Sequence, residues 1–200
     1  MSSPETARIA VLLDFENVHR VGHGLYSPGL PRYQCVPEPS LIADMLANRR
    51  KVPTVTTSVQ VFRGRPNPAF EPTPASAADK QRQLWERRDD RVRVRSHPLF
   101  YRNWPQVPPV EKGVDVALAI EAVRLTLQDH DKFDALVVFS SDNDLVPAVK
   151  LCFQLRGPAI EVACWTGANP LQDATTHLPW CHFLTEKDWR SVTRDWTGRA

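Results

Sequence analysis

The sequence predicts an α/β fold in which a doubly wound, mainly parallel sheet carries helices on both faces. Three observations favour this class: apolar runs typical of strands buried on both faces, helix-like segments that alternate with them, and turn residues at the boundaries. The chain has 200 residues, of which 42% are hydrophobic and 24% are charged, which is typical of a soluble globular protein. We therefore expect one domain over residues 1–200.

The first part of the chain indicates a strand, a helix and a second strand. Residues 8–15 (RIAVLLDF) form an apolar run that ends in polar residues, as in a strand buried within a parallel sheet. A loop rich in glycine and proline is expected over 22–39, and Ser40 suits the N-cap of a short helix. Residues 54–62 (TVTTSVQVF) are rich in β-branched residues and predict the next strand.

An insertion is predicted at about 64–90. Residues 64–75 contain four prolines, which lack the N–H group that a sheet needs, so we expect an exposed loop there. A charged helix is expected to follow over about 77–88. The strand predicted at 91–96 (RVRVRS) alternates arginine with valine, which gives it one basic face and one apolar face.

The second half continues the alternation of helix and strand. Strands are predicted at 134–139 and 159–165, with a helix between them at 145–155. A short edge strand and then a polar tail from about residue 185 are expected at the end. The helix predicted over 114–129 has apolar residues at the spacing of an amphipathic helix, namely Val116, Ile120, Val123 and Leu127.

Charge is distributed unevenly along the chain. Residues 60–104 contain 10 Lys and Arg against 5 Asp and Glu, whereas residues 105–200 contain 9 against 13. This asymmetry suggests that one part attracts polyanions and another holds cations, although solvated helix faces would produce a similar pattern.

Four acidic residues follow predicted strands or open predicted helices: Asp14, Asp115, Asp142 and Asp144. Sites in such sheets form at the carboxyl ends of strands, so we expect these carboxylates to meet at one edge. Clustered carboxylates repel one another unless a cation lies among them, and oxygen ligands suit Mg²⁺ or Mn²⁺. The alternative is structural, because Asp also caps helices and is favoured in their first turn.

Three segments, read in order, carry a resemblance to a known family: LLDFENV, EKGVDVALAIEAV and VVFSSDNDLVPAV. The chain resembles bacterial NYN-domain proteins of the PIN-like nuclease superfamily. The resemblance implies a divalent-metal-dependent endoribonuclease that hydrolyses phosphodiester bonds with a metal-activated water. It implies Asp14, Asp115 and Asp142 as the central acidic residues, Asp144 as the fourth, and Asn17 as a further catalytic position. Ser141 stands where the family usually has glycine.

RNA is the substrate that the resemblance implies, single-stranded or structured. Arginines can follow a phosphate backbone, and Tyr101 and Trp104 can stack on unpaired bases. Lys112 and the two serines of the Ser-Ser-Asp turn can contact a phosphate, and Asn17 can orient a water or a phosphate or cap the turn. The RNA-binding residues that we expect are Arg63, Arg65, Arg93, Arg95, Arg102, Lys112, Ser140 and Ser141.

Two alternatives remain open. The first is a non-catalytic RNA-binding or scaffold protein that retains the NYN fold. The second is a toprim-like enzyme, which also uses Asp-x-Asp, but the order of the acidic residues disfavours it. We expect a cytoplasmic protein with no membrane contact, and a homodimer or a partner protein remains open.

Overall fold

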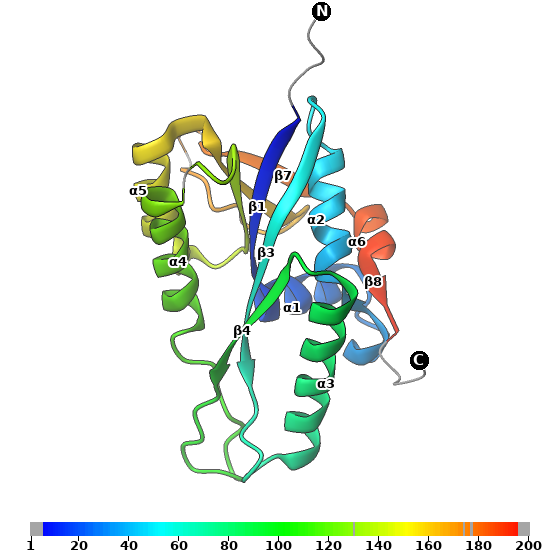
Figure 1. Cartoon of the computed structure of the whole chain (residues 1–200). Helices are drawn as coiled ribbons and strands as arrows, with labels where there is room; N and C mark the ends of the chain where they lie inside the picture. Colours follow the sequence, from blue (N-terminus) through cyan, green and yellow to red (C-terminus); the bar gives the residue numbers. More distant parts are fainter. Residues whose placement is uncertain (1–5, 130, 174, 177, 196–200) are drawn as a thin grey trace, which may run out of the picture.

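A computed structural model describes residues 6–129, 131–173, 175–176 and 178–195, and its centre is a six-stranded sheet (Figure 1). The strand order is β4-β3-β1-β5-β6-β7, and every neighbouring pair is parallel, which confirms the predicted doubly wound arrangement. The strands are β1 (Ala7–Asp14), β3 (Thr54–Arg65), β4 (Val92–Pro98), β5 (Ala135–Phe139), β6 (Ile160–Trp165) and β7 (Trp180–Leu184).

Helices cover both faces of this sheet, and each face has its own apolar core (Figure 1). One face carries α1 (Phe15–Tyr26), α2 (Pro39–Asn48), α3 (Pro72–Arg88) and α6 (Glu186–Val192). The other face carries α4 (Val114–Gln128) and α5 (Val146–Arg156). Short elements complete the fold: the strands β2 (Val36–Pro37) and β8 (Thr193–Arg194), and the 3-10 turns η1 (Arg32–Gln34), η2 (Asn143–Leu145) and η3 (Gly157–Ala159).

Helix α1 occupies the start of the region in which the sequence indicated a loop rich in glycine. Gly22 lies inside this helix, and a Cβ atom there would come within 2.4 Å of the Trp189 ring and 2.8 Å of the Trp165 indole nitrogen. The glycine is therefore a packing requirement, because it lets two buried tryptophans approach the helix backbone.

The segment after residue 185 is not the polar tail that the sequence predicted. Thr185 caps α6, and its hydroxyl and backbone N–H both bond to the Asp188 carboxylate at 2.9 and 2.7 Å. Trp189 is buried by this helix, and β8 then pairs antiparallel with β2. Residues 185–195 therefore remain mostly polar and exposed, but they form regular structure instead of a tail, because Trp189 and Val192 are buried against the core.

The predicted insertion is more regular than expected. Strand β3 continues to Arg65, and α3 begins at Pro72, five residues before the predicted start. Prolines are tolerated in the first turn of a helix, where the missing N–H would have no partner, so Pro72 and Pro74 start the helix.

Most of the predicted apolar stripe of α4 faces solvent instead of the sheet, although Val123 is partly buried and packs against the core. Val116, Ile120 and Leu127 are 55%, 64% and 57% exposed, whereas Leu118 and Leu125 face the core. The helix is confirmed, but the face that its spacing indicated is the outer one. None of the helices in the described residues has the length and apolar character needed to cross a membrane.

Candidate active site

Asp14 lies at the carboxyl end of β1, where the chain turns directly into α1, and it is 6% exposed. One carboxylate oxygen accepts a hydrogen bond from the Ser140 hydroxyl at 2.7 Å, and the other accepts from the Asn17 backbone N–H at 3.4 Å. Burial is the main cause that raises the pKa of Asp14 to about 6, and the nearby charges of Asp142 and Asp115 add to it. The charges of Asp142 and Asp115 therefore act on the Asp14 carboxylate.

The turn after β5 is held to α1 by a small hydrogen-bond network. The hydroxyl of Ser140 donates to Asp14 and accepts from the Asp142 backbone N–H at 3.1 Å. The Asn17 side-chain carbonyl accepts from the Ser141 backbone N–H at 2.9 Å. Ser140 is fully buried and its proton is committed to Asp14, so the expectation that its hydroxyl contacts RNA is wrong. Asn17 holds the turn, which matches the structural alternative for that residue.

Asp115, Asp142 and Asp144 are more accessible than Asp14. Asp115 lies in the first turn of α4, and Asp142 and Asp144 lie on the turn that follows β5. The Asp142 carboxylate accepts from the Asp144 backbone N–H at 3.0 Å, so it also caps η2. Asp144 is exposed.

The chemistry of this donor set fits a hard divalent cation. Within the part of the chain that the structure describes, none of these four carboxylates forms an ion pair with Lys, Arg or His. A buried carboxylate that lies near two others and has no basic partner is unfavourable when ionised, and a bound cation would offset this negative charge. In the same described residues, no three or more acidic, His or Cys side chains converge closely enough to enclose an ion. Asp115 and Asp142 lie near enough to Asp14 for their charges to raise its pKa, Asp144 is not among the groups that do so, and the four carboxylates do not close around an ion.

Two acidic residues of this region were not assigned from the sequence. Glu111 accepts a hydrogen bond from the Gly64 backbone N–H, and burial together with the charges of Glu16 and Asp14 raises its pKa. Glu16 pairs with Arg32 at 2.9 Å. The only signal for Glu111 was its place two residues before Gly113 in the EKGVD segment, since a loop carboxylate has no periodicity to mark it.

The first two expected RNA-binding arginines are engaged inside the molecule. The Arg63 guanidinium lies 4.9 Å from the centre of the Phe15 ring and bonds to the Gln81 side chain, and burial lowers its pKa. Arg65 forms two hydrogen bonds of 2.8 and 2.6 Å with the Asp79 carboxylate. The structure corrects the expectation for Arg63, because packing holds its guanidinium, whereas Arg65 stays partly exposed and its bidentate ion pair with Asp79 offsets its charge.

Arg93 and Arg95 lie exposed on β4, the edge strand of the sheet (Figure 1). Phe62 pairs with Arg95 on one side and with Asp14 on the other, so Asp14 and Arg95 lie in one row across three strands. Two strand spacings of about 4.8 Å put their backbones about 10 Å apart. The guanidinium of Arg95 donates to Gln60 at 3.0 Å, and Arg93 donates to backbone carbonyls. Neither arginine pairs with a carboxylate among the described residues.

Arg102 and Lys112 lie on the arm, which we define as residues 99–113, between β4 and α4 (Figure 1). Both side chains are exposed. Tyr101 is less available than expected, because one ring face stacks on Phe70 at 4.7 Å and its hydroxyl bonds to Glu71. The edge of Tyr101 also meets the Trp104 ring at 5.5 Å. These two aromatic residues pack the arm.

The fold and the acidic edge define a PIN-like, nuclease-type α/β domain. A family model described as NYN domain matches residues 8–177, so the chain belongs to the NYN domain family. A solved structure described as a protein of unknown function from Vibrio parahaemolyticus has the same fold. Its TM-score is 0.58 at 16% sequence identity, and the match covers 96% of this chain and 99% of that chain. No curated protein matches the sequence.

Proposed function

We propose that this protein is a divalent-metal-dependent endoribonuclease that hydrolyses RNA phosphodiester bonds. The observation that carries the proposal is the Asp14 carboxylate at the carboxyl edge of the sheet, whose pKa burial raises to about 6, with Asp115 and Asp142 close enough for their charges to add to this rise. Membership of the NYN family supports the same class of reaction.

Asp14, Asp115 and Asp142 would hold Mg²⁺ or Mn²⁺, with Asp144 completing the ligand set. When bound, the cation supplies a water of lowered pKa as the nucleophile and offsets charge on the scissile phosphate. Ser140 and Asn17 are positioning residues in this proposal. Ser140 orients the Asp14 carboxylate by its hydrogen bond of 2.7 Å, and Asn17 fixes the turn that carries Asp142.

RNA would approach across the basic edge of the sheet. Arg93 and Arg95 lie on the face of the sheet that carries Asp14, and Arg102 and Lys112 lie on the arm that leads into the first turn of α4. Exposed cations without carboxylate partners attract a phosphate backbone and release its counterions. The backbone N–H of Ser141 is bonded to Asn17, so only the Ser141 hydroxyl remains available to a phosphate.

Metal binding at the acidic edge can be tested before any activity is known. Thermal unfolding should be followed in a titration with Mn²⁺ and with Mg²⁺ for the wild type, Asp142→Asn and Asp90→Asn. The control Asp90 is exposed and lies in the loop that enters β4, at the opposite end of the strands. The metal should stabilise the wild type and the control but not Asp142→Asn, because an ion that binds only the folded arrangement raises stability. An equal shift in all three proteins would place the ion elsewhere.

A non-catalytic RNA-binding protein is the second candidate, and one observation favours it. The residue after Ser140 carries a side chain where the family usually has glycine, in the turn that bears Asp142. If metal binds and RNA binds but no RNA is cut, replacement of Ser141 by glycine tests whether this side chain blocks the reaction.

A further inference from the structure

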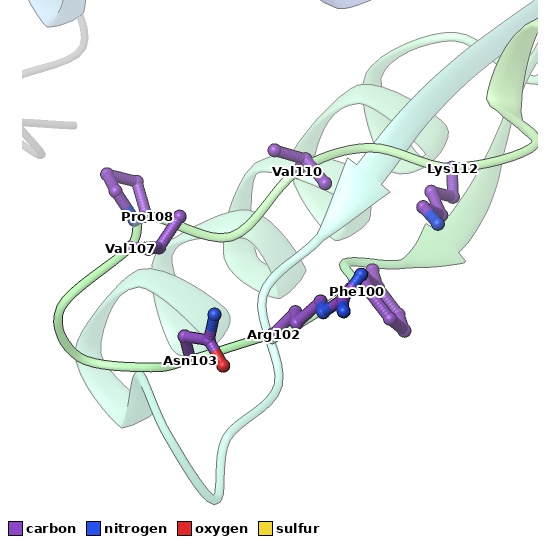
Figure 2. A pocket seen from close by; sticks show the side chains of 7 residues that line it. All are labelled: Phe100, Arg102, Asn103, Val107, Pro108, Val110 and Lys112. Atoms are coloured by element: carbon purple, nitrogen blue, oxygen red, sulfur yellow. The ribbon is translucent and has the colours of Figure 1, made fainter.

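The arm forms a pocket of its own beside the acidic edge. Its cavity has a volume of about 270 Å³ (Figure 2). Two backbone hydrogen bonds of 2.9 and 3.2 Å join Phe100 and Val110 and close the arm into a hairpin. Figure 2 shows side chains from both limbs of this hairpin around the pocket, namely Phe100, Arg102, Asn103, Val107, Pro108, Val110 and Lys112.

The lining combines an exposed aromatic ring with two cations. The Lys112 ammonium lies 4.3 Å from the centre of the Phe100 ring, and that ring is 44% exposed. Arg102 lies beside them in the same view (Figure 2). Over the described ranges, neither Arg102 nor Lys112 forms an ion pair. Arg65, whose backbone carbonyl accepts a hydrogen bond from Leu99 at the start of the arm, is by contrast paired with Asp79. No acidic residue lines the pocket.

The base of the arm is fixed to the sheet next to the candidate active site. Glu111 accepts from the Gly64 backbone N–H, and a Cβ at Gly64 would lie 2.3 Å from the Leu99 side chain and 2.6 Å from Glu111. Gly113 then adopts a φ of 77° and caps α4, whose second residue is Asp115. The pocket is therefore anchored to the element that supplies one of the carboxylates.

We propose that this pocket binds one nucleotide of single-stranded RNA, outside the position that is cut. The base would lie against the Phe100 ring and the aliphatic wall formed by Val107, Pro108 and Val110, and Arg102 and Lys112 would hold its phosphate. A base within a duplex has both faces covered by its neighbours, so only an unpaired nucleotide can use the ring. This inference rests on the proposed function for its substrate class, but binding can be measured without cleavage.

The test is binding of a fluorescein-labelled 12-nucleotide single-stranded RNA, measured by anisotropy at several salt concentrations in excess chelator. Phe100→Leu removes the aromatic ring and keeps apolar volume, and Lys112→Gln removes one charge. Phe183→Leu is the matched control for the ring, since Phe183 is 45% exposed on β7, the edge strand opposite β4, and does not line the pocket. Lys51→Gln is the control for the charge, because Lys51 is exposed in the loop before β3, at the other end of the strands. Thermal unfolding checks that each variant folds.

Because one stacked base is lost, Phe100→Leu should bind the RNA about tenfold more weakly than the wild type, whereas Phe183→Leu should bind like the wild type. Lys112→Gln should lower the log–log salt slope by about 0.7, and Lys51→Gln should leave it unchanged. A duplex RNA of the same length should bind wild type and Phe100→Leu alike. The assignment would be overturned if both pocket variants bound single-stranded RNA with the affinity and salt slope of the wild type. It would also be overturned if Phe100→Leu lost as much affinity for the duplex as for the single strand. The measurement does not depend on cleavage, so an inactive wild type that still shows this pattern would refute the proposed reaction and keep the pocket.

Discussion

Asp14→Asn should make the protein more stable at neutral pH when no divalent metal is present. The native state holds Asp14 with a pKa of about 6, against 3.8 for the ordinary carboxyl group. At about 1.4 kcal/mol per pKa unit, ionising this buried group costs the native state roughly 3 kcal/mol above pH 6. The asparagine removes this cost, and its carbonyl oxygen can still accept a hydrogen bond from the Ser140 hydroxyl. Its amide nitrogen then faces the other donor, the Asn17 backbone N–H, and this contact is repulsive. We therefore expect a net gain of about 1 to 2 kcal/mol.

The sign of the pH dependence follows from the direction of the shift. Between pH 3.8 and about 6 the native state retains a proton that the unfolded state has lost, so wild-type stability falls as pH rises through this interval. Asp14→Asn should therefore be slightly less stable than the wild type at pH 4, where only the cost of the amide nitrogen remains. Its relative stability should rise between pH 4 and 6, and its advantage should stay constant above pH 6.

Urea unfolding at pH 4, 5, 6 and 7.5 in excess chelator measures this difference. Asp79→Asn serves as a control of opposite sign, because the hydrogen bond from Arg65 lowers the pKa of Asp79. That variant should lose a little stability, by nearly the same amount at every pH of this series, because the stabilisation from a lowered pKa fades only below pH 3.8. The reasoning is refuted if Asp14→Asn is no more stable than wild type at pH 7.5, or if its advantage persists undiminished at pH 4.

The remaining predictions concern packing and RNA binding. Gly22→Ala should destabilise the fold by about 1 to 3 kcal/mol in urea unfolding, because its methyl group meets Trp189, whereas Gly24→Ala, with nothing within 4 Å, should stabilise α1 by roughly 0.5 to 1 kcal/mol. If both changes altered the free energy of unfolding equally, helix propensity alone, and not contact with Trp189, would determine their effect. Replacing Arg93 and Arg95 together by Ala should weaken RNA binding and lower the salt slope by up to about 1.4, as measured by anisotropy across salt concentrations. An unchanged affinity and slope would mean that RNA does not cross β4.

The sheet and the acidic edge could be predicted because each depends on local sequence. Continuous apolar runs such as residues 9–13 mark strands buried on both faces, and parallel strands place the residues after them on one edge. Asp14 and Asp142 were found in this way. Helix α1 was missed because Gly22 looks like a loop residue until Trp189 is brought against it by the chain end.

The partners of charged groups could not be read from the sequence. Arg65 looks like a free cation in the sequence, but Asp79 neutralises it across a helix and a strand. Glu111 shows the converse, since its place near Asp14 depends on the path of the arm and on a bond to Gly64. In α4, the apolar periodicity predicts the helix but not which of its faces packs on the sheet. Val116 and Leu118 are both apolar, and only the tertiary packing leaves the first exposed and buries the second.

Cleavage of labelled RNA by wild type, Asp115→Asn and Asp90→Asn, purified side by side, tests the central claim most directly. With Mn²⁺ or Mg²⁺ the wild type and Asp90→Asn should cut RNA internally at equal rates and stop in excess chelator. Asp115→Asn should be slower by orders of magnitude with RNA affinity largely intact, because the carboxylate acts on the reaction while cations hold the phosphates. Equal cleavage by all three proteins, or cleavage that continues in chelator, would contradict the assignment of the acidic edge as a metal-dependent nuclease site.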